Sequence, residues 1–388
     1  MFPRYKAHSH EETDMKDENI DDVLSELEES LRQSAAHFMG YPCNMDFDYS
    51  KILPFLKYPI NNVGDPYIKS LYGLHTHEME CEVLDEYADM VRAPKDDRWG
   101  YVTSGGTEGN MYGIYLAREM YPKCTVYFSE DTHYSVLKIL RLTNTNHVKL
   151  RSLPNGEINY LDLRDEINLN RHNVPVIFAN IGTTMKGAND NIANIKQLLS
   201  EINITKYYIH ADAALHGMML PYMDNPPPFD FGDGIDSISV SGHKFIGSPL
   251  PCGMVIAKKS NVDIIANSVE YIGTMDTTIS GSRSGFTPLV LWFAFKNKSR
   301  LDFREMVYRC IHNADYMIEK CNNNGIPAWR NPSSNTVIIP RPSDVVVKKW
   351  QIAVQGDIAH VIVMPHVGHE LIDAMTDELI HDQQKKRK

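Results

Sequence analysis

The chain has 388 residues, of which 43% are hydrophobic and 23% are charged, and its formal net charge is −11 at pH 7. This length suffices for a large buried core in two or three structural units, whereas the negative charge disfavours nucleic acid and anionic membrane surfaces as main partners. The sequence has no apolar run long enough to span a membrane, no secretory signal, and no metal-ligand or disulfide spacing among its six cysteines, so we expect a cytoplasmic protein with reduced thiols and no metal.

The N-terminal part begins with polar and charged residues 1–20. Over residues 23–31, apolar side chains recur at helical spacing with acidic residues between them, which predicts an amphipathic helix. We assign residues 1–70 to an N-terminal segment, residues 71–285 to a large domain and residues 286–388 to a small C-terminal α+β domain.

Over residues 99–257, short β-rich runs alternate with helix-like stretches. The runs read YVTS, TVYFS, VIFAN, YYIHAD, SISVSG and GMVIAKK. This alternation is typical of an α/β fold with a mostly parallel central sheet covered by helices. Ligands of such sheets gather at the carboxyl ends of the strands, so we expect the polar segments that follow these runs to form one site.

The first of these segments, TSGGTEGN at 103–110, lies between a predicted strand and a predicted helix. A Gly-rich turn at a helix start offers free backbone N–H groups and the positive end of the helix dipole, which suits a phosphate. Gly105, Gly106 and Thr107 are the candidate donors. Because the segment is neither a Walker loop nor a GxGxxG turn, we expect a small monophosphate rather than ATP or NAD.

Two further strand ends carry polar side chains. His133 follows TVYFS, and it is either a satisfied polar residue or a flat ring that stacks on a cofactor. Thr183 and Thr184 follow VIFAN, where a hydroxyl can bond the phenolic oxygen of a cofactor.

Asp212 ends the run YYIHAD among small residues. It is either a helix N-cap or a buried carboxylate, which needs a partner because an isolated charge is costly in apolar surroundings. The protonated pyridine nitrogen of pyridoxal 5′-phosphate (PLP) is such a partner, and the pair keeps the ring cationic so that it accepts electrons.

Lys244 follows the run SISVSG in a turn of serine, glycine and histidine. A lysine there is either a solvated charge or, where the site disfavours the ammonium, an amine of lowered pKa that forms an imine with a carbonyl cofactor. The phosphate-binding turn and Asp212 at other strand ends favour the second interpretation.

After residue 285 an apolar stretch, 289–295, predicts a helix that continues through Arg309 and Met317. Strand candidates at 336–340 and 360–364 indicate a smaller α+β unit. The basic residues KKRK at 385–388 resemble a localisation signal, but a solvated terminus is the favoured interpretation.

In chain order the polar segments are the Gly-rich turn, THYS, GTT, HADAA and SGHK, with Asp212 and Lys244 32 positions apart. This order resembles that of the group II PLP-dependent decarboxylases of fold type I, over about residues 41–378. The resemblance implies the PLP-dependent transferase-like α/β fold, with a mostly parallel central sheet and a smaller C-terminal α+β domain. It also implies a carboxy-lyase that uses PLP and acts on a small polar L-amino acid.

The resemblance gives each matching position a role. Lys244 is the Schiff-base lysine, Asp212 is the partner of the pyridine nitrogen, and His133 stacks on the ring and touches the substrate. Thr184 approaches the ring oxygen. The residues expected at the phosphate are Gly105, Gly106, Thr107, Ser241 and His243, although larger family members carry asparagine in place of Ser241.

The substrate is inferred from segments 60–78 and 349–365, which resemble the serine decarboxylases of plants more than the short histidine decarboxylases of bacteria. We therefore expect L-serine to be converted to ethanolamine and CO2, with L-histidine to histamine as the alternative. Tyr72 and His75 are the predicted substrate-binding residues, because their bulk would narrow the site to suit a short side chain; packed or exposed positions away from the cofactor are the alternative.

Tyr271 is the candidate proton donor to Cα, since related enzymes carry a tyrosine in a mobile loop at this place; a packed aromatic is the alternative. In the family, the segment equivalent to residues 281–285 lies at a dimer interface. The resemblance therefore implies a homodimer or a higher homo-oligomer.

Three other interpretations start from the same residues. A lyase or aminotransferase of this fold would share the lysine and the aspartate, but aminotransferases typically lack the pair His243–Lys244. A decarboxylase converted to an aldehyde synthase would typically have lost Tyr271. A cofactor-free scaffold would have no chemical reason to keep Lys244, Asp212 and His133 together.

Overall fold

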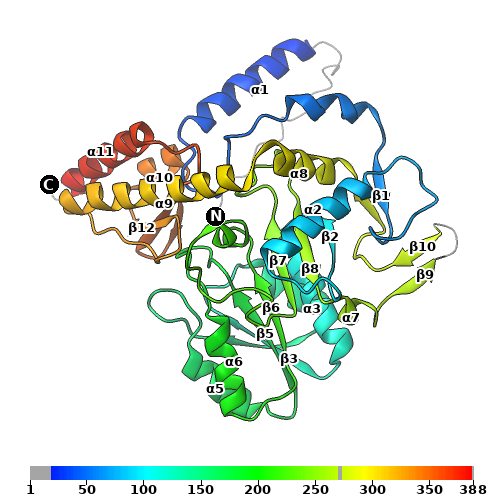
Figure 1. Cartoon of the computed structure of the whole chain (residues 1–388). Helices are drawn as coiled ribbons and strands as arrows, with labels where there is room; N and C mark the ends of the chain where they lie inside the picture. The colour runs from blue at the N-terminus through cyan, green and yellow to red at the C-terminus, as the bar shows by residue number, and fades with distance from the viewer. Residues whose placement is uncertain (1–18, 270–272, 387–388) are drawn as a thin grey trace, which may run out of the picture.

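The fold is described from a computed structural model, which defines residues 19–269 and 273–386 (Figure 1). Its centre is a seven-stranded sheet in the order β2-β8-β7-β6-β5-β3-β4. The strands are β2 Trp99–Thr103, β3 Cys124–Ser129, β4 Asn146–Leu150, β5 Val174–Asn180, β6 Tyr208–Asp212, β7 Ser237–Ser241 and β8 Gly253–Ala257. Strands β4, β3, β5, β6 and β7 run parallel, whereas β8 is antiparallel to both β7 and β2. The expected mostly parallel sheet is confirmed.

The central strands are buried on both faces, which explains the largely apolar sequence of β5, whereas the polar residues His210 and Asp212 of β6 are buried with hydrogen-bond partners. Successive side chains of β5 point to opposite sides, so that Ile177 and Ala179 pack into one core cluster while Val176 and Phe178 pack into a second. Strand β4 was not expected from the sequence. It lies at the edge of the sheet with most of its side chains exposed, and its polar residues give no apolar run.

Helices cover both faces of this sheet. Those of the large domain are α2 His77–Met90, α3 Gly106–Met120, α4 Ser135–Leu142, α5 Tyr160–Leu169, α6 Ile192–Glu201 and α7 Lys259–Val262, with short 3₁₀ turns at η2 His216–Met218 and η3 Leu220–Tyr222. Helices α3 and α4 pack into one core cluster, whereas α2, α5 and α6 pack into the other. The sheet therefore has a separate core on each side.

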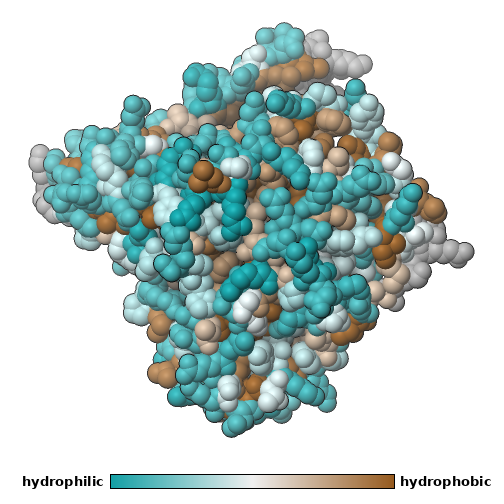
Figure 2. Space-filling view, in the orientation of Figure 1, coloured by the Kyte–Doolittle hydropathy of each residue, from teal (hydrophilic) through white to brown (hydrophobic). Residues whose placement is uncertain are grey.

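The N-terminal part contains α1 Ile20–Ala35, the 3₁₀ helix η1 Ser50–Lys57 and β1 Asn61–Val63. Helix α1 is the predicted amphipathic helix, but none of its residues is buried in the single chain. Its exposed apolar side chains are Ile20, Val23, Leu24, Leu27 and Leu31. Figure 2 shows hydrophobic atoms along this helix at the upper edge of the molecule.

Two small β-ladders lie beside the large sheet. Strand β1 pairs antiparallel with β11 Ser282–Ser284, and β9 Asn267–Val269 pairs with β10 Thr274–Asp276.

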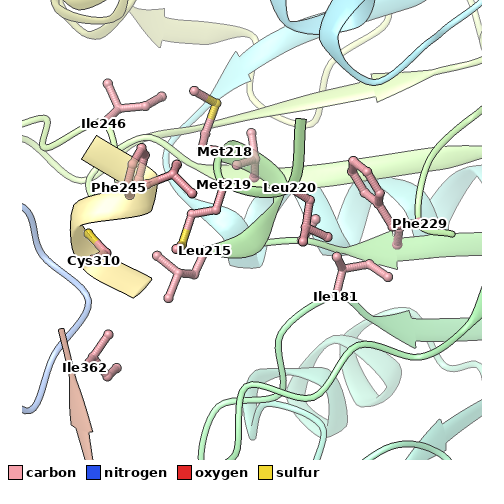
Figure 3. Close-up of a cluster of buried hydrophobic side chains, with 14 of the residues drawn as sticks. Ile181, Leu215, Met218, Met219, Leu220, Phe229, Phe245, Ile246, Cys310 and Ile362 are labelled. Carbon is pink, nitrogen blue, oxygen red and sulfur yellow. The ribbon is translucent and has the colours of Figure 1, made fainter. Parts of the chain in front are cut away.

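The C-terminal part is a smaller α+β unit, as expected. It contains α8 Phe286–Asn297, α9 Arg300–Asn323, β12 Thr336–Pro340, α10 Asp344–Trp350, β13 Ala353–Gln355, β14 Ile358–Ile362 and α11 His369–Lys386. Its three strands form an antiparallel sheet in the order β12-β14-β13. Figure 3 shows Cys310 of α9 near Leu215 and Phe245 of the large domain, and all three belong to one buried cluster.

One expectation about this part is wrong. The predicted single helix from residue 289 through Met317 is two helices, because the chain breaks at Lys298 and Ser299. The Ser299 side chain accepts from the backbone N–H of Asp302, and the Asp302 carboxylate accepts from the backbone N–H of Ser299. This capping box starts a new helix inside an otherwise continuous apolar pattern.

The predicted boundary at residues 285/286 falls between β11 and α8, and α8 packs against α2 of the large domain. The domain limits therefore stay predictions. Among the helices of the described ranges, none is both long and apolar enough to cross a membrane.

Candidate active site

A cavity of about 610 Å³ lies at the carboxyl ends of β5, β6 and β7. Its walls come from three parts of the chain: the N-terminal segment 38–43, the loops that follow the parallel strands, and the C-terminal sheet. From the last of these, Thr336, His360 and Ile362 contribute. The cavity therefore lies at the strand ends, where the sequence predicted a site, but the N-terminal segment and the C-terminal sheet also form its walls.

Lys244 lines this cavity in the turn after β7. The turn is held by Asn44, whose backbone N–H donates to the Lys244 carbonyl at 3.0 Å and whose Nδ2 donates to the Phe245 carbonyl at 3.0 Å. Burial lowers the pKa of the Lys244 ammonium, while the negative charge of Asp212 partly opposes that shift. A larger share of neutral amine is then available as a nucleophile.

Asp212 is the last residue of β6 and is 7% exposed. One carboxylate oxygen accepts from Nδ2 of Asn110 at 2.9 Å, and the other accepts from the backbone N–H of Ala214 at 3.3 Å. The next helical turn, η2, has Leu215 as its N-cap. Asp212 is therefore a cavity carboxylate rather than a helix cap.

The predicted phosphate-binding turn starts α3. Gly105 is its N-cap, Gly106 and Thr107 line the cavity, and a Cβ added to Gly106 would lie 2.8 Å from Oγ of Ser241. Only glycine lets the helix start approach this serine so closely. The free N–H groups of the first helical turn, next to the hydroxyl of Ser241, can hold an anion.

The turn is fixed from behind by Glu108, which accepts from the backbone N–H and the hydroxyl of Ser104 at 2.8 and 2.6 Å. His243 also lines the cavity, with Nδ1 2.9 Å from the Cys252 carbonyl, and burial lowers the pKa of its ring. The Cys252 backbone N–H also lies 3.3 Å from the same Nδ1, so both backbone groups of Cys252 hold the ring at the cavity wall.

His133 and both threonines predicted from the sequence also line the cavity. Nδ1 of His133 lies 2.8 Å from Oγ of Ser135, and burial lowers the pKa of the His133 ring against the opposing charge of Asp212. The Thr183 hydroxyl accepts from the Ala188 N–H at 3.0 Å, whereas Thr184 is exposed to the cavity. Of the two threonines, Thr184 has the freer hydroxyl.

The structure does not bring the two predicted substrate-binding residues to this cavity. The Tyr72 hydroxyl donates to the Pro59 carbonyl at 3.1 Å, and the His75 ring stacks on that of His77 with centroids 4.7 Å apart. Tyr271 lies outside the described residues. The roles of these three residues stay predictions.

The cavity residues that were not assigned from the sequence include Asn110, Asn180 and His216. Asn110 closes the Gly-rich motif and His216 follows HADAAL, so each lies within a segment that the sequence already marked. Asn180 ends β5, and its Nδ2 donates to Asp190 at 3.0 Å and to Ser129 at 3.2 Å. No pattern in the chain distinguished these side chains from ordinary loop residues.

The family described as "Pyridoxal-dependent decarboxylase conserved domain" matches residues 3–327. The chain belongs to this family. It is 49% identical over 347 residues to a histidine decarboxylase of Vibrio anguillarum (89% of this chain, 90% of the relative). It is 48% identical over 349 residues to a histidine decarboxylase of Pseudomonas entomophila (89% and 87%).

Solved structures of decarboxylases have the same fold. L-methionine decarboxylase from Streptomyces sp.590 superposes with a TM-score of 0.84 at 27% identity, covering 94% of this chain and 96% of that one. Glutamate decarboxylase of Lactobacillus brevis superposes with a TM-score of 0.79 at 17% identity, covering 99% and 95%. The fold type I architecture, PLP as cofactor and a carboxy-lyase activity follow from family membership.

The cavity of this decarboxylase fits PLP in each of its parts. It offers a helix start for a phosphate, a carboxylate for a pyridinium and a lysine whose amine has no hydrogen-bond partner among the described residues. In the same ranges no group of three or more histidine, cysteine or acidic side chains is placed to hold a metal ion.

Proposed function

We propose that this enzyme decarboxylates L-histidine to histamine and CO2. The observation that carries the proposal is the 48–49% identity, over nine-tenths of the chain, to relatives named histidine decarboxylase. The expectation of L-serine is replaced by its alternative because those relatives favour histidine. Tyr72 and His75, which were expected to narrow the site for serine, do not line the cavity of the single chain and so give serine no support.

Lys244 would hold the cofactor covalently, and its amine suits that task because burial favours the uncharged form. Asp212 would bind the ring nitrogen, while Gly106, Thr107 and Ser241 would hold the phosphate. When bound, PLP supplies an electron sink for the electron pair that remains at Cα as CO2 leaves.

His133 would lie against the ring as a neutral imidazole, since burial lowers its pKa. The cavity is lined in part by apolar groups such as Leu215 and Ile362, which exclude water and so strengthen the contacts of Asp212 and Lys244. Tyr271 remains our proposed proton donor to Cα.

The test compares release of carboxyl-labelled CO2 from histidine and from serine, each supplied alone with PLP. We expect histidine to be the faster substrate by at least tenfold, because a site built around one side chain leaves polar groups unpaired with another. Faster release from serine would overturn the proposal.

A second measurement tests the lysine. Lys244→Ala should lose both turnover and the cofactor that borohydride fixes to the protein, whereas Lys258→Ala should lose neither. Lys258 is a matched control because it lies just after β8 and pairs with Asp236 at 2.6 Å, outside the cavity. Fixation of the cofactor in Lys244→Ala would show that another amine carries it.

We also propose that the enzyme is cytoplasmic and that it works as a homodimer or a higher homo-oligomer. The alternative of a cofactor-free scaffold is not supported, because the family to which the chain belongs is that of the pyridoxal-dependent decarboxylases.

A further inference from the structure

Behind Asp212 lies a continuous chain of four hydrogen bonds through the core. The Tyr208 hydroxyl is 2.9 Å from Oγ of Ser237, which is 2.7 Å from Nδ1 of His210. Nε2 of His210 is 3.0 Å from Oδ1 of Asn110, whose Nδ2 is 2.9 Å from Oδ2 of Asp212. The five residues come from β6, β7 and α3.

The chemistry of the groups gives this chain one direction. An ionised carboxylate only accepts, so Asn110 must turn its NH2 group toward Asp212 and its oxygen toward His210. The oxygen needs a donor, so His210 carries its proton on Nε2 and accepts at Nδ1 from the Ser237 hydroxyl. Ser237 in turn accepts from the Tyr208 hydroxyl. Every polar atom along the chain has a partner of the required kind.

The chain is shielded from water. Tyr208, Ser237 and His210 are 0% exposed and Asn110 is 3% exposed. Burial lowers the pKa of His210 to about 3, so the ring is neutral at physiological pH. A Cβ added to Gly113 of α3 would lie 2.1 Å from Nδ1 of His210, so glycine at this position gives the imidazole its space.

We propose that Asn110, His210 and Ser237 are positioning residues that hold the Asp212 carboxylate in place, and thereby keep the cofactor's ring nitrogen protonated. This inference rests on the proposed role of Asp212. A hydrogen bond donated to a carboxylate favours its charged form, and in a buried site each such bond contributes more than it would in water. The remaining members fix the rotamer and tautomer that let Asn110 donate.

The experiment uses holoenzyme reconstituted with PLP that is ¹⁵N-labelled at the ring nitrogen. The nitrogen's NMR chemical shift reports its protonation directly as the pH is raised, independently of turnover. In Asn110→Ala we expect the midpoint for loss of this proton to fall by about one pH unit, a tenfold change, which is typical of one lost hydrogen bond to a charged group.

Three more variants separate positioning from a general loss of packing. Ser237→Ala should lower the midpoint by about half a pH unit, a threefold change in the dissociation constant of the proton, since His210 then lacks the hydroxyl that fixes its tautomer. His210→Gln keeps an N–H donor for Asn110, so its midpoint should stay close to that of the wild type. Asn313→Ala is the matched control. It removes a buried amide of α9 that donates to the Val367 carbonyl at 2.8 Å, and it should leave the midpoint unchanged.

Wild-type titration in both Asn110→Ala and Ser237→Ala would overturn the proposal. If Asn110→Ala gives no folded holoenzyme, Ser237→Ala decides, because it removes a single hydroxyl. Asp212→Asn separates this inference from the function on which it rests. A ring nitrogen that stays protonated in that variant would refute the role of Asp212 itself, whereas loss of the proton there but not in Asn110→Ala would refute only the chain behind it.

Discussion

His216 illustrates at the scale of a single residue how the cavity wall holds polar groups in a neutral state. Its side chain is 0% exposed, and Nδ1 lies 2.8 Å from Oδ1 of Asn189. Nε2 is buried and has no hydrogen-bond partner among the described residues. Burial, followed by the nearby charge of Lys244, lowers the pKa of His216 to about 4.

This shift makes a prediction about stability at low pH. The unfolded chain binds a proton at His216 with a pKa of 6.5, whereas the folded protein binds it only near 4. Between these values the unfolded state holds more protons, so the contribution of His216 to stability is lost as the pH falls. From pH 7 to pH 5 the loss is about 2 kcal/mol.

Urea unfolding of the holoenzyme at both pH values measures this loss. In His216→Gln the fall in the free energy of unfolding between pH 7 and pH 5 should be smaller by about 2 kcal/mol than in the wild type. Equal falls in the two proteins would mean that the folded state accommodates a charged imidazole.

Asp212 gives the second prediction at this scale. Asp212→Asn should fold and bind PLP but lose turnover by orders of magnitude, because the cationic ring matters most when charge develops at Cα. Steady-state rates together with cofactor absorbance test this. Near-normal turnover would assign the carboxylate a structural role.

At the scale of helices, the break between α8 and α9 depends on one cap. The Ser299 hydroxyl makes two hydrogen bonds with Asp302, one to its carboxylate and one from its backbone N–H. Ser299→Ala removes both and should lower the free energy of unfolding by about 1 kcal/mol. Urea unfolding measures the change. Ser25→Ala is the control, since this exposed serine lies inside α1 and bonds only the Asp21 carbonyl, at 2.7 Å; an equal loss in both variants would contradict the role of the cap.

The elements differ in how far their sequences reveal them. Strands β5, β6 and β7 were predicted because their runs are rich in β-forming residues and are buried on both faces, although β7 has three serines and β6 contains His210 and Asp212. Strand β4 was missed because it lies at an exposed edge, and the α8–α9 break was missed because a cap of two residues does not interrupt an apolar pattern. The spacing of apolar residues in a sequence indicates which residues are buried. It therefore predicts neither a strand whose residues are mostly exposed nor a helix break within a continuously buried stretch.

The site shows the same limit. Lys244, Asp212 and the α3 turn were predicted because strand ends in an α/β sheet converge. The partnership of Asn110 with His210 joins positions 100 residues apart, and nothing in the local sequence of either residue indicates the other. Neither could the sequence reveal that residues 38–43 and the C-terminal sheet close the cavity.

At the scale of the whole molecule, the proposed homodimer makes a direct prediction. Sedimentation equilibrium of the holoenzyme should give twice the 44.2 kDa of one chain, or a higher multiple. A mass of one chain at micromolar concentration, with full turnover, would refute the oligomer.

The three-part wall of the cavity also has a consequence for biosynthesis. The Ile362 N–H donates to the Met39 carbonyl at 2.8 Å, and Nε2 of His360 lies 3.1 Å from the Gly40 carbonyl, so residues about 320 positions apart meet beside the cofactor site. When the residues of the large sheet have left the ribosome, those of β14, which carries His360 and Ile362, have not yet emerged. The nascent polypeptide would therefore have an open site until β14 has emerged, and cofactor capture would follow formation of the large sheet rather than serve as a nucleus for it.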